Sequence, residues 1–245
     1  MKVVDKLNRK QSMENNPPVT IAFIGDSVTQ GCFEVYFETE TKMETIFETM
    51  NSYPTKVKEL LSILYPNVQV NIINSGISGD NIFGGLNRLE RDVLRYSPDL
   101  VVIGYGLNDC LHGGEKQVEK FKKGMDELTS RIANSGAEII YISQGPYCTK
   151  MSPHVTDMRF KPCIDRLIEL ETNGTLREYY NAYIEVAKKY GAKICDVYSV
   201  WEKLKNGGVN TTELLANKIN HPIREFHYYM AIKLIEVMFE ACDVI

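Results

Sequence analysis

The sequence of 245 residues lacks the features of membrane, nucleic-acid-binding and disulfide-rich proteins. No stretch approaches the ~18 to 20 apolar residues that a membrane-spanning helix needs. Lysines and arginines form no basic run, and a net charge of −4 gives no support for a nucleic-acid surface. The six cysteines are far apart and include no Cys-x-x-Cys pair. We therefore expect reduced thiols, because a chain of this size needs no disulfides to fold.

Residues 1–18 are polar and lack the apolar segment of a secretory signal peptide. We therefore expect a polar N-terminal arm at 1–18, a cytoplasmic protein and a single domain at 19–245. The composition, 44% hydrophobic and 24% charged, is that of an average soluble globular protein. The oligomeric state is not readable from the sequence.

Apolar runs typical of buried strands alternate with patterns typical of helices. The expected strands are 19–24, 68–74, 99–105, 137–142 and 192–197, and the expected helices are 53–64, 81–96, 115–133, 176–190 and 222–241. Strands that are apolar throughout belong to parallel sheets covered on both faces. The order predicts an α/β fold, a three-layer α/β/α sandwich of flavodoxin-like form with a five-stranded parallel sheet.

Two insertions, 32–52 and 144–173, interrupt this alternation. The first begins with a partly alternating segment, 33–38, as expected for a short strand or hairpin. The stretch 31–52 also contains five glutamates and one lysine. These charges predict an acidic rim that disfavours anionic ligands.

A polar motif, Gly25-Asp26-Ser27, directly follows the first strand. The carboxyl ends of parallel strands are where ligands bind in open α/β sheets. A serine presented there on a tight turn is placed like a nucleophile. The same residues also fit the ordinary cap of the next helix, since Ser and Asp are common N-cap residues.

Three further motifs follow later expected strands or precede the last helix. They are Ser78-Gly79-Asp80, Gly106-Leu107-Asn108-Asp109 and His221-Pro222. An Asn amide at the mouth of a sheet is a donor for a developing oxyanion. A histidine held just before a helix that starts with proline is suited to act as a general base. Each motif alone also fits turn and cap chemistry.

In this order the four motifs resemble those of the SGNH hydrolase superfamily, the GDSL-type esterases and lipases. The resemblance spans residues 21–222, and Val28 replaces the leucine of the GDSL signature. It implies that Ser27 is the nucleophile and His221 the general base. It further implies an oxyanion hole formed by the Ser27 N–H, the Gly79 N–H and the Asn108 side-chain amide, with no metal or organic cofactor.

One position departs from the family pattern. The family usually has an aspartate three residues before the histidine, where it orients the imidazole, and Lys218 stands there instead. A lysine cannot accept the imidazole N–H. The remaining candidates for this role are Asn217, a backbone carbonyl, Asp196 and Glu213.

The predicted function is a serine ester hydrolase that removes small acyl groups, acetyl above all, from a carbohydrate-like or other small alcohol. One alternative is a lipase, lysophospholipase or acyl-thioesterase of the same superfamily. The aromatic and methionine side chains of 33–50 would then line an acyl pocket, although they also fit simple packing of the insertion. A second alternative, favoured by Lys218, is a degenerate domain that only binds an acylated sugar or a protein. A metallophosphoesterase is excluded because none of the four histidines belongs to an Asp-x-His pair.

Overall fold

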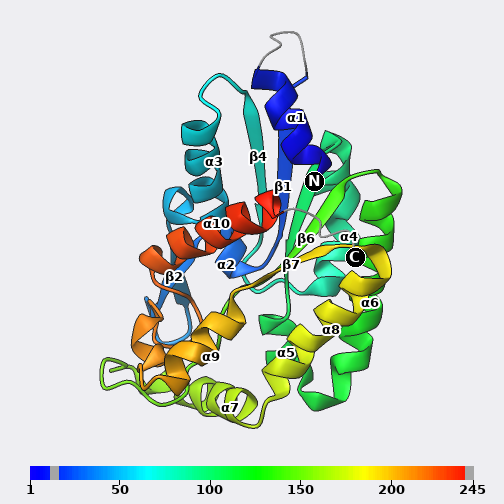
Figure 1. Cartoon of the computed structure of the whole chain (residues 1–245). Helices are drawn as coiled ribbons and strands as arrows, with labels where there is room; N and C mark the ends of the chain where they lie inside the picture. Colours follow the sequence, from blue (N-terminus) through cyan, green and yellow to red (C-terminus); the bar gives the residue numbers. More distant parts are fainter. Residues whose placement is uncertain (12–16, 241–245) are drawn as a thin grey trace.

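A five-stranded parallel sheet forms the centre of the computed structural model, which describes residues 1–11 and 17–240 (Figure 1). The strands lie in the order β4-β1-β5-β6-β7. Numbered along the chain, this is the flavodoxin-like order 2-1-3-4-5. The predicted fold is therefore confirmed. The strands are β1 (Val19–Gly25), β4 (Val70–Gly76), β5 (Leu100–Gly104), β6 (Glu138–Ser143) and β7 (Lys193–Asp196).

Helices cover both faces of the sheet. On one side α3 (Tyr53–Leu64) packs against α10 (Arg224–Phe239), and on the other lie α4 (Ile82–Asp92), α6 (Val118–Asn134) and α8 (Thr175–Tyr190) (Figure 1). Besides α1 (Lys2–Gln11), the other helices are α2 (Ser27–Gln30), α5 (Leu107–Gly113), α7 (Lys161–Thr172) and α9 (Tyr198–Asn206), with the 3-10 turns η1 (Thr49–Asn51), η2 (Leu94–Tyr96), η3 (Glu115–Gln117), η4 (Met158–Phe160) and η5 (Thr211–Leu214). No helix within the described ranges is long and apolar enough to cross a membrane.

Burial of the sheet explains why its strands read as continuous apolar runs. Every residue of β1 and of β5 is buried between the two helical layers. Burying apolar area stabilises the fold by about 25 cal/mol per Å², so the two central strands contribute most per residue. Strand pairing is in register along β1, with Ile21 opposite Ile72 on one side and Leu100 on the other.

The first insertion is an antiparallel hairpin of β2 (Cys32–Phe37) and β3 (Met43–Phe47), as the alternating segment predicted. Its pairing register is irregular between Cys32 and Val35, which is a β-bulge. The second insertion, 144–173, begins without regular secondary structure and ends in η4 and α7. Five cysteines lie in the described ranges and all are free thiols, whereas Cys242 lies outside these ranges.

The expectation of a polar arm is corrected for residues 2–11, which form the helix α1 (Lys2–Gln11). Val3 and Leu7, four residues apart, bury their side chains in the core. The Glu138 carboxylate accepts hydrogen bonds from the first two helical N–H groups at 2.9 and 2.7 Å. Three apolar residues, Val3, Val4 and Leu7, among seven polar ones are too weak a signal for sequence composition to detect. Residues 12–16 of the expected arm lie outside the described ranges.

A substitution in α1 tests this correction. Leu7→Ala should lower the free energy of unfolding by about 2–5 kcal/mol, because a fully buried leucine leaves a cavity. The measurement is urea unfolding followed by circular dichroism, with Ile63→Ala, whose side chain is exposed, as the matched control. Equal stabilities of the Leu7 and Ile63 variants would contradict the docked helix.

Candidate active site

The first three polar motifs meet at one edge of the sheet. β1 pairs with β4 on one side and with β5 on the other, so the residues after these strands share a crevice. This is the point where the strand order reverses, the usual ligand-binding position in such sheets. The strands approach closely here, since a Cβ on Gly25 would lie 2.5 Å from the Gly104 carbonyl oxygen. A glycine at the end of β1 is therefore required.

Ser27 and His221 lie in direct contact, although 194 positions separate them in the sequence. The Ser27 Oγ is 3.0 Å from the His221 Nε2. Asp26 caps the short helix α2 by accepting the Val28 N–H, which fixes Ser27 as its first residue. Both Ser27 and His221 are buried, with exposed fractions of 4% and 5%. Because the surrounding residues bury both side chains, they restrict the pair to this arrangement.

The Nδ1 atom of His221 faces the β2–β3 hairpin. It lies 3.0 Å from the carbonyl oxygen of Phe33 and 3.4 Å from the Cys32 Sγ. A carbonyl oxygen only accepts hydrogen bonds, so it favours the tautomer with the proton on Nδ1. That tautomer leaves the Nε2 lone pair facing the Ser27 hydroxyl. The pair is thus arranged to move the Ser27 proton onto Nε2.

The Asn217 side chain also contacts the His221 Nδ1, but through its amide nitrogen, which cannot accept the Nδ1 proton. Its Oδ1 accepts the backbone N–H groups of Ile219, Asn220 and His221, at 2.9 to 3.0 Å. These bonds fix the amide orientation and leave Nδ2 at 3.1 Å from Nδ1. Asn217 therefore shapes the loop that carries His221 and gives Nδ1 no acceptor.

The two distant carboxylates considered for this role lie elsewhere. Asp196 is the last residue of β7, and it accepts the Ser199 N–H at 3.0 Å and the Ser143 hydroxyl at 3.1 Å. Glu213 pairs with Lys218 at 3.4 Å. Within residues 1–11 and 17–240, no hydrogen bond joins either carboxylate to His221. Of the candidates for orienting His221, Asp196 is therefore ruled out, and a backbone carbonyl, another of the candidates, lies at Nδ1.

The expected oxyanion donors come from the loops that follow β1, β4 and β5. Gly79 has φ of +79°, a conformation that favours glycine, and a Cβ there would meet only open space. Asn108 donates through Nδ2 to the Asp80 carbonyl at 2.8 Å, which joins the second and third motifs. No hydrogen bond among the described residues uses the N–H of Ser27 or of Gly79. These donors are available to a ligand.

A buried arginine that sequence reasoning missed connects the same three strand ends. The Arg88 guanidinium donates to the Gly25 carbonyl at 3.1 Å and to the Ser75 carbonyl at 2.6 Å. It also pairs with Asp80 at 2.7 Å and donates to the Tyr105 hydroxyl at 2.8 Å. Arg88 lies inside a helical pattern with nothing in the sequence to mark it. It holds the loops of the first three motifs in one arrangement.

Burial sets the protonation of the site. Desolvation lowers the pKa of His221 to about 4, opposed by the Phe33 hydrogen bond and the Glu34 charge. His221 is therefore a neutral base at pH 7. Burial also raises the pKa of Asp26 to about 7 and that of Asp109 to about 7. No group of three His, Cys, Asp or Glu side chains in the described part of the chain is arranged as a metal site.

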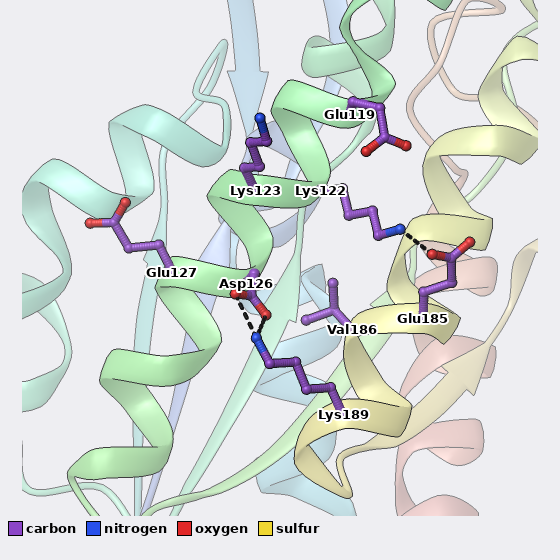
Figure 2. A pocket seen from close by; sticks show the side chains of 8 residues that line it. All are labelled: Glu119, Lys122, Lys123, Asp126, Glu127, Glu185, Val186 and Lys189. Carbon is purple, nitrogen blue, oxygen red and sulfur yellow. Dashed lines mark hydrogen bonds and ion pairs between the residues drawn. The ribbon is translucent and has the colours of Figure 1, made fainter.

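Two hollows border the site and a third is remote from it. A hollow of about 120 Å³ includes Asn108, and one of about 390 Å³ lies between the hairpin and the loop before α7, next to Asn217. The third, of about 500 Å³, lies between α6 and α8 and is lined by charged side chains and Val186 (Figure 2). The ion pairs Lys122–Glu185 and Lys189–Asp126 cross it (Figure 2). None of the expected site residues lines this third hollow.

Substitution of Arg88 should lower the free energy of unfolding strongly. Arg88→Met leaves Asp80 buried without its cation and two strand-end carbonyls without a donor, for a loss of about 3–5 kcal/mol of unfolding free energy. Chemical unfolding measures this loss. Arg91→Met, one turn of helix away on an exposed side chain, is the matched control and should stay within about 0.5 kcal/mol of wild type. A small loss at Arg88 would contradict its connecting role.

Two curated proteins are similar in sequence to part of the chain. An arylesterase of Vibrio mimicus is 35% identical over 89 residues, 36% of this chain and 42% of that protein. An acetylxylan esterase of Geobacillus stearothermophilus is also 35% identical over 89 residues, 36% of this chain and 39% of that protein. The aligned part thus spans about two fifths of each curated relative.

Solved structures match the fold over most of the chain. A mutant of an acetyl-xylooligosaccharide esterase from Geobacillus has a TM-score of 0.66 at 20% identity, covering 94% of this chain and 98% of its own. A two-domain esterase active on acetylated mannans has a TM-score of 0.68 at 18% identity, covering 99% of this chain and 54% of its own. The model of the GDSL-like lipase/acylhydrolase family matches residues 23–227, from β1 to the start of α10. The chain therefore belongs to the GDSL-like lipase/acylhydrolase family.

Proposed function

We propose that this protein is a serine ester hydrolase that removes small acyl groups, acetyl above all, from a carbohydrate-like alcohol. The observation that carries the proposal is the contact of 3.0 Å between Ser27 Oγ and His221 Nε2, with Nδ1 held on the Phe33 carbonyl. A serine hydroxyl needs an adjacent base to attack an ester, and the base needs the correct tautomer. Both conditions are met at the edge of the sheet where ligands bind.

The reaction follows from the positions of these groups. The Ser27 Oγ forms a bond with the ester carbonyl carbon while its proton passes to His221 Nε2. The resulting imidazolium gives this proton to the alcohol oxygen as the C–O bond of the ester breaks, which leaves an acyl-Ser27. Water then attacks the acyl group, His221 takes a proton from it, and the carboxylic acid departs as Ser27 regains its proton.

The oxyanion formed in each step needs donors that are already in place. The Ser27 N–H and the Gly79 N–H have no partner among the described residues, and the Asn108 amide is held by the Asp80 carbonyl. We assign these three groups to the oxyanion. Loss of one such donor typically costs about 100- to 1,000-fold in rate.

Two observations support an acetyl group on a carbohydrate. The hollow of about 390 Å³ near the His221 loop has aromatic walls from Tyr36, Phe37 and Phe160, and aromatic faces pack well against sugar rings. The relatives named as esterases of acetylated xylan and mannan point the same way.

A second candidate, hydrolysis of longer acyl esters, is favoured by one observation. Apolar side chains of the β2–β3 hairpin and η1 are exposed instead of packing the insertion. They include Tyr36, Met43, Ile46, Phe47 and Met50. Exposed apolar side chains beside a site can contact an acyl chain.

Substitution of the pair tests the mechanism. Ser27→Ala and His221→Ala should each lower kcat for p-nitrophenyl acetate by at least about 1,000-fold, because each removes one half of the proton transfer. Release of p-nitrophenolate measures the rate. His112→Ala, an exposed histidine outside the pair, is the control and should keep wild-type turnover. Full activity of the Ser27 variant would eliminate the mechanism.

The pH profile tests the buried base. Because burial holds the His221 pKa near 4, kcat/KM should stay flat from neutral pH downward and fall only as pH drops through about 4. The sign follows from protonation, since the imidazolium has no lone pair to accept the Ser27 proton. Initial rates between pH 3.5 and 8 measure this profile on protein shown to stay folded. A midpoint near the ordinary histidine value of about 6.5 would contradict a desolvated base.

Acyl-chain length separates the two candidate substrates. We expect kcat/KM to fall from acetate through butyrate to octanoate p-nitrophenyl esters, as the relatives named as esterases of acetylated xylan and mannan suggest. A preference for octanoate would support the second candidate instead. Met50→Ser, which removes an exposed apolar side chain, should then reduce octanoate turnover selectively.

A further inference from the structure

We propose that Arg224 is a positioning residue for His221, because it clamps the bulged β2–β3 hairpin so that the Phe33 carbonyl stays on Nδ1. The clamp consists of Arg224, Glu34 and Glu48. It takes the place of the aspartate that the family has at the position of Lys218. The effect of the clamp on the reaction rate rests on the proposed function, whereas its effect on the His221 tautomer does not.

The β-bulge makes the Phe33 carbonyl available. In regular antiparallel pairing a strand carbonyl alternately faces its partner strand or the opposite side. The register of β2 against β3 shifts between Cys32 and Val35, and Phe33 and Glu34 are the two residues within this irregularity. A bulge leaves backbone groups outside the ladder and redirects them. Here the carbonyl meets His221 Nδ1 at 3.0 Å.

A bulge in a two-stranded hairpin needs an external contact to keep its geometry, because such a hairpin is marginally stable alone. Arg224 supplies this contact from the first residue of α10. Its Nη1 and Nη2 donate to the two Glu34 carboxylate oxygens at 2.7 and 3.0 Å. Its Nε donates to Glu48 at 2.9 Å, and Nη2 also reaches the second Glu48 oxygen. The guanidinium lies 4.4 Å above the Phe33 ring.

Geometry distinguishes this clamp from an ordinary surface ion pair. A single planar cation makes two-point contacts with two carboxylates, Glu34 within the bulge and Glu48 just after β3, and lies about one third exposed. Bidentate pairs of this kind fix orientation, which a lysine cannot reproduce. Arg224 is also only three residues after His221, so one short segment carries both the base and the clamp.

The same hairpin contains a second cluster of charge that serves as an internal comparison. Lys42 lies between Glu38 and Glu44, each at 2.6 Å, near the hairpin turn. Its side chain is 58% exposed, and neither glutamate forms a hydrogen bond with His221 or Phe33. Exposed pairs of this type contribute about 0 to 1 kcal/mol. Lys42 is therefore the matched control for Arg224.

Few charges surround His221 other than those of the clamp. From β2 it faces the Cys32 thiol, whose pKa burial raises to about 12, and Glu34, whose pKa the Arg224 hydrogen bonds lower. From α10 it is near His227, whose pKa burial lowers to about 3. At pH 7 the thiol and both imidazoles are neutral. The ring orientation then depends on the hydrogen bond at Nδ1.

The first experiment reads the tautomer directly. The four histidines of the protein are labelled with ¹⁵N and observed by NMR at pH 7. The His221 signals are assigned as those missing from the spectrum of His221→Ala. Wild type and Lys42→Met should hold His221 with the proton on Nδ1. Arg224→Met and the milder Glu48→Gln should show a mixture of tautomers, more so for Arg224→Met. An unchanged Nδ1–H signal in folded Arg224→Met would overturn the proposal.

The second experiment follows catalysis in the same variants. Arg224→Met should lower kcat for p-nitrophenyl acetate by about 100-fold with KM nearly unchanged, as expected for a misplaced base. Arg224→Lys keeps the charge but loses the two-point contacts, and should recover only part of this loss. Lys42→Met should retain wild-type kcat. Loss of activity that merely tracks a lower Tm in all variants would mean a structural role only.

A rescue variant separates positioning from general stability. Asn217→Asp keeps an oxygen for the three backbone N–H groups and puts a second near 3.1 Å from Nδ1. In the Arg224→Met background it should restore kcat at least about tenfold, because a carboxylate then fixes the ring as an aspartate does in serine triads. The clamp is contradicted if Asn217→Asp restores no activity and Arg224→Met also leaves the His221 tautomer unchanged. If wild type hydrolyses no ester, the proposed function fails and the NMR result alone decides on the clamp.

Discussion

The hydrogen bond between the Phe33 carbonyl and His221 Nδ1 is the contact on which the chemistry of this site depends. Burial removes water from the imidazole and holds its pKa near 4, so solvent does not set its orientation. One backbone carbonyl therefore determines which nitrogen carries the proton. The Nε2 lone pair that faces Ser27 at 3.0 Å follows from it. A neutral acceptor gives less charge stabilisation to an imidazolium than a carboxylate does, which fits a base of low pKa.

The rest of the site is built to keep two halves of the molecule in a fixed relation. Arg88 joins the carbonyl ends of β1 and β4 to Asp80 and Tyr105, and Asn108 joins the Asp80 backbone to α5. The second half is the loop from Asn217 to His221, ordered by three backbone hydrogen bonds to a single side chain. The hairpin touches this loop from outside the sheet. Preorganised donors of this kind need no rearrangement when charge develops.

The sequence predicts the part of this arrangement that periodicity and motif order encode. The apolar runs of β1 and β5 are buried on both faces, and they predict the strand positions and the order of the sheet. The order of the motifs then predicts that Ser27 lies near the glycine and asparagine motifs. Contacts made by long side chains or by backbone atoms are not encoded in this way. Arg88 and Arg224 look like surface residues of helices, and the carbonyl of Phe33 has no side-chain signature. Two of the five glutamates read as an acidic rim, Glu34 and Glu48, form ion pairs with Arg224, which offsets one of their two charges.

The central claim is that Ser27 is made nucleophilic by a neutral, buried His221, and one measurement tests it most directly. The protein is treated with diethyl p-nitrophenyl phosphate, and the modified residue is located by mass spectrometry of peptides. The account predicts one diethylphosphoryl group, on Ser27, formed as p-nitrophenolate leaves and with a rate that declines only as pH falls through about 4. No modification of Ser27, or a rate that titrates near pH 6.5 as an exposed histidine does, would contradict the account.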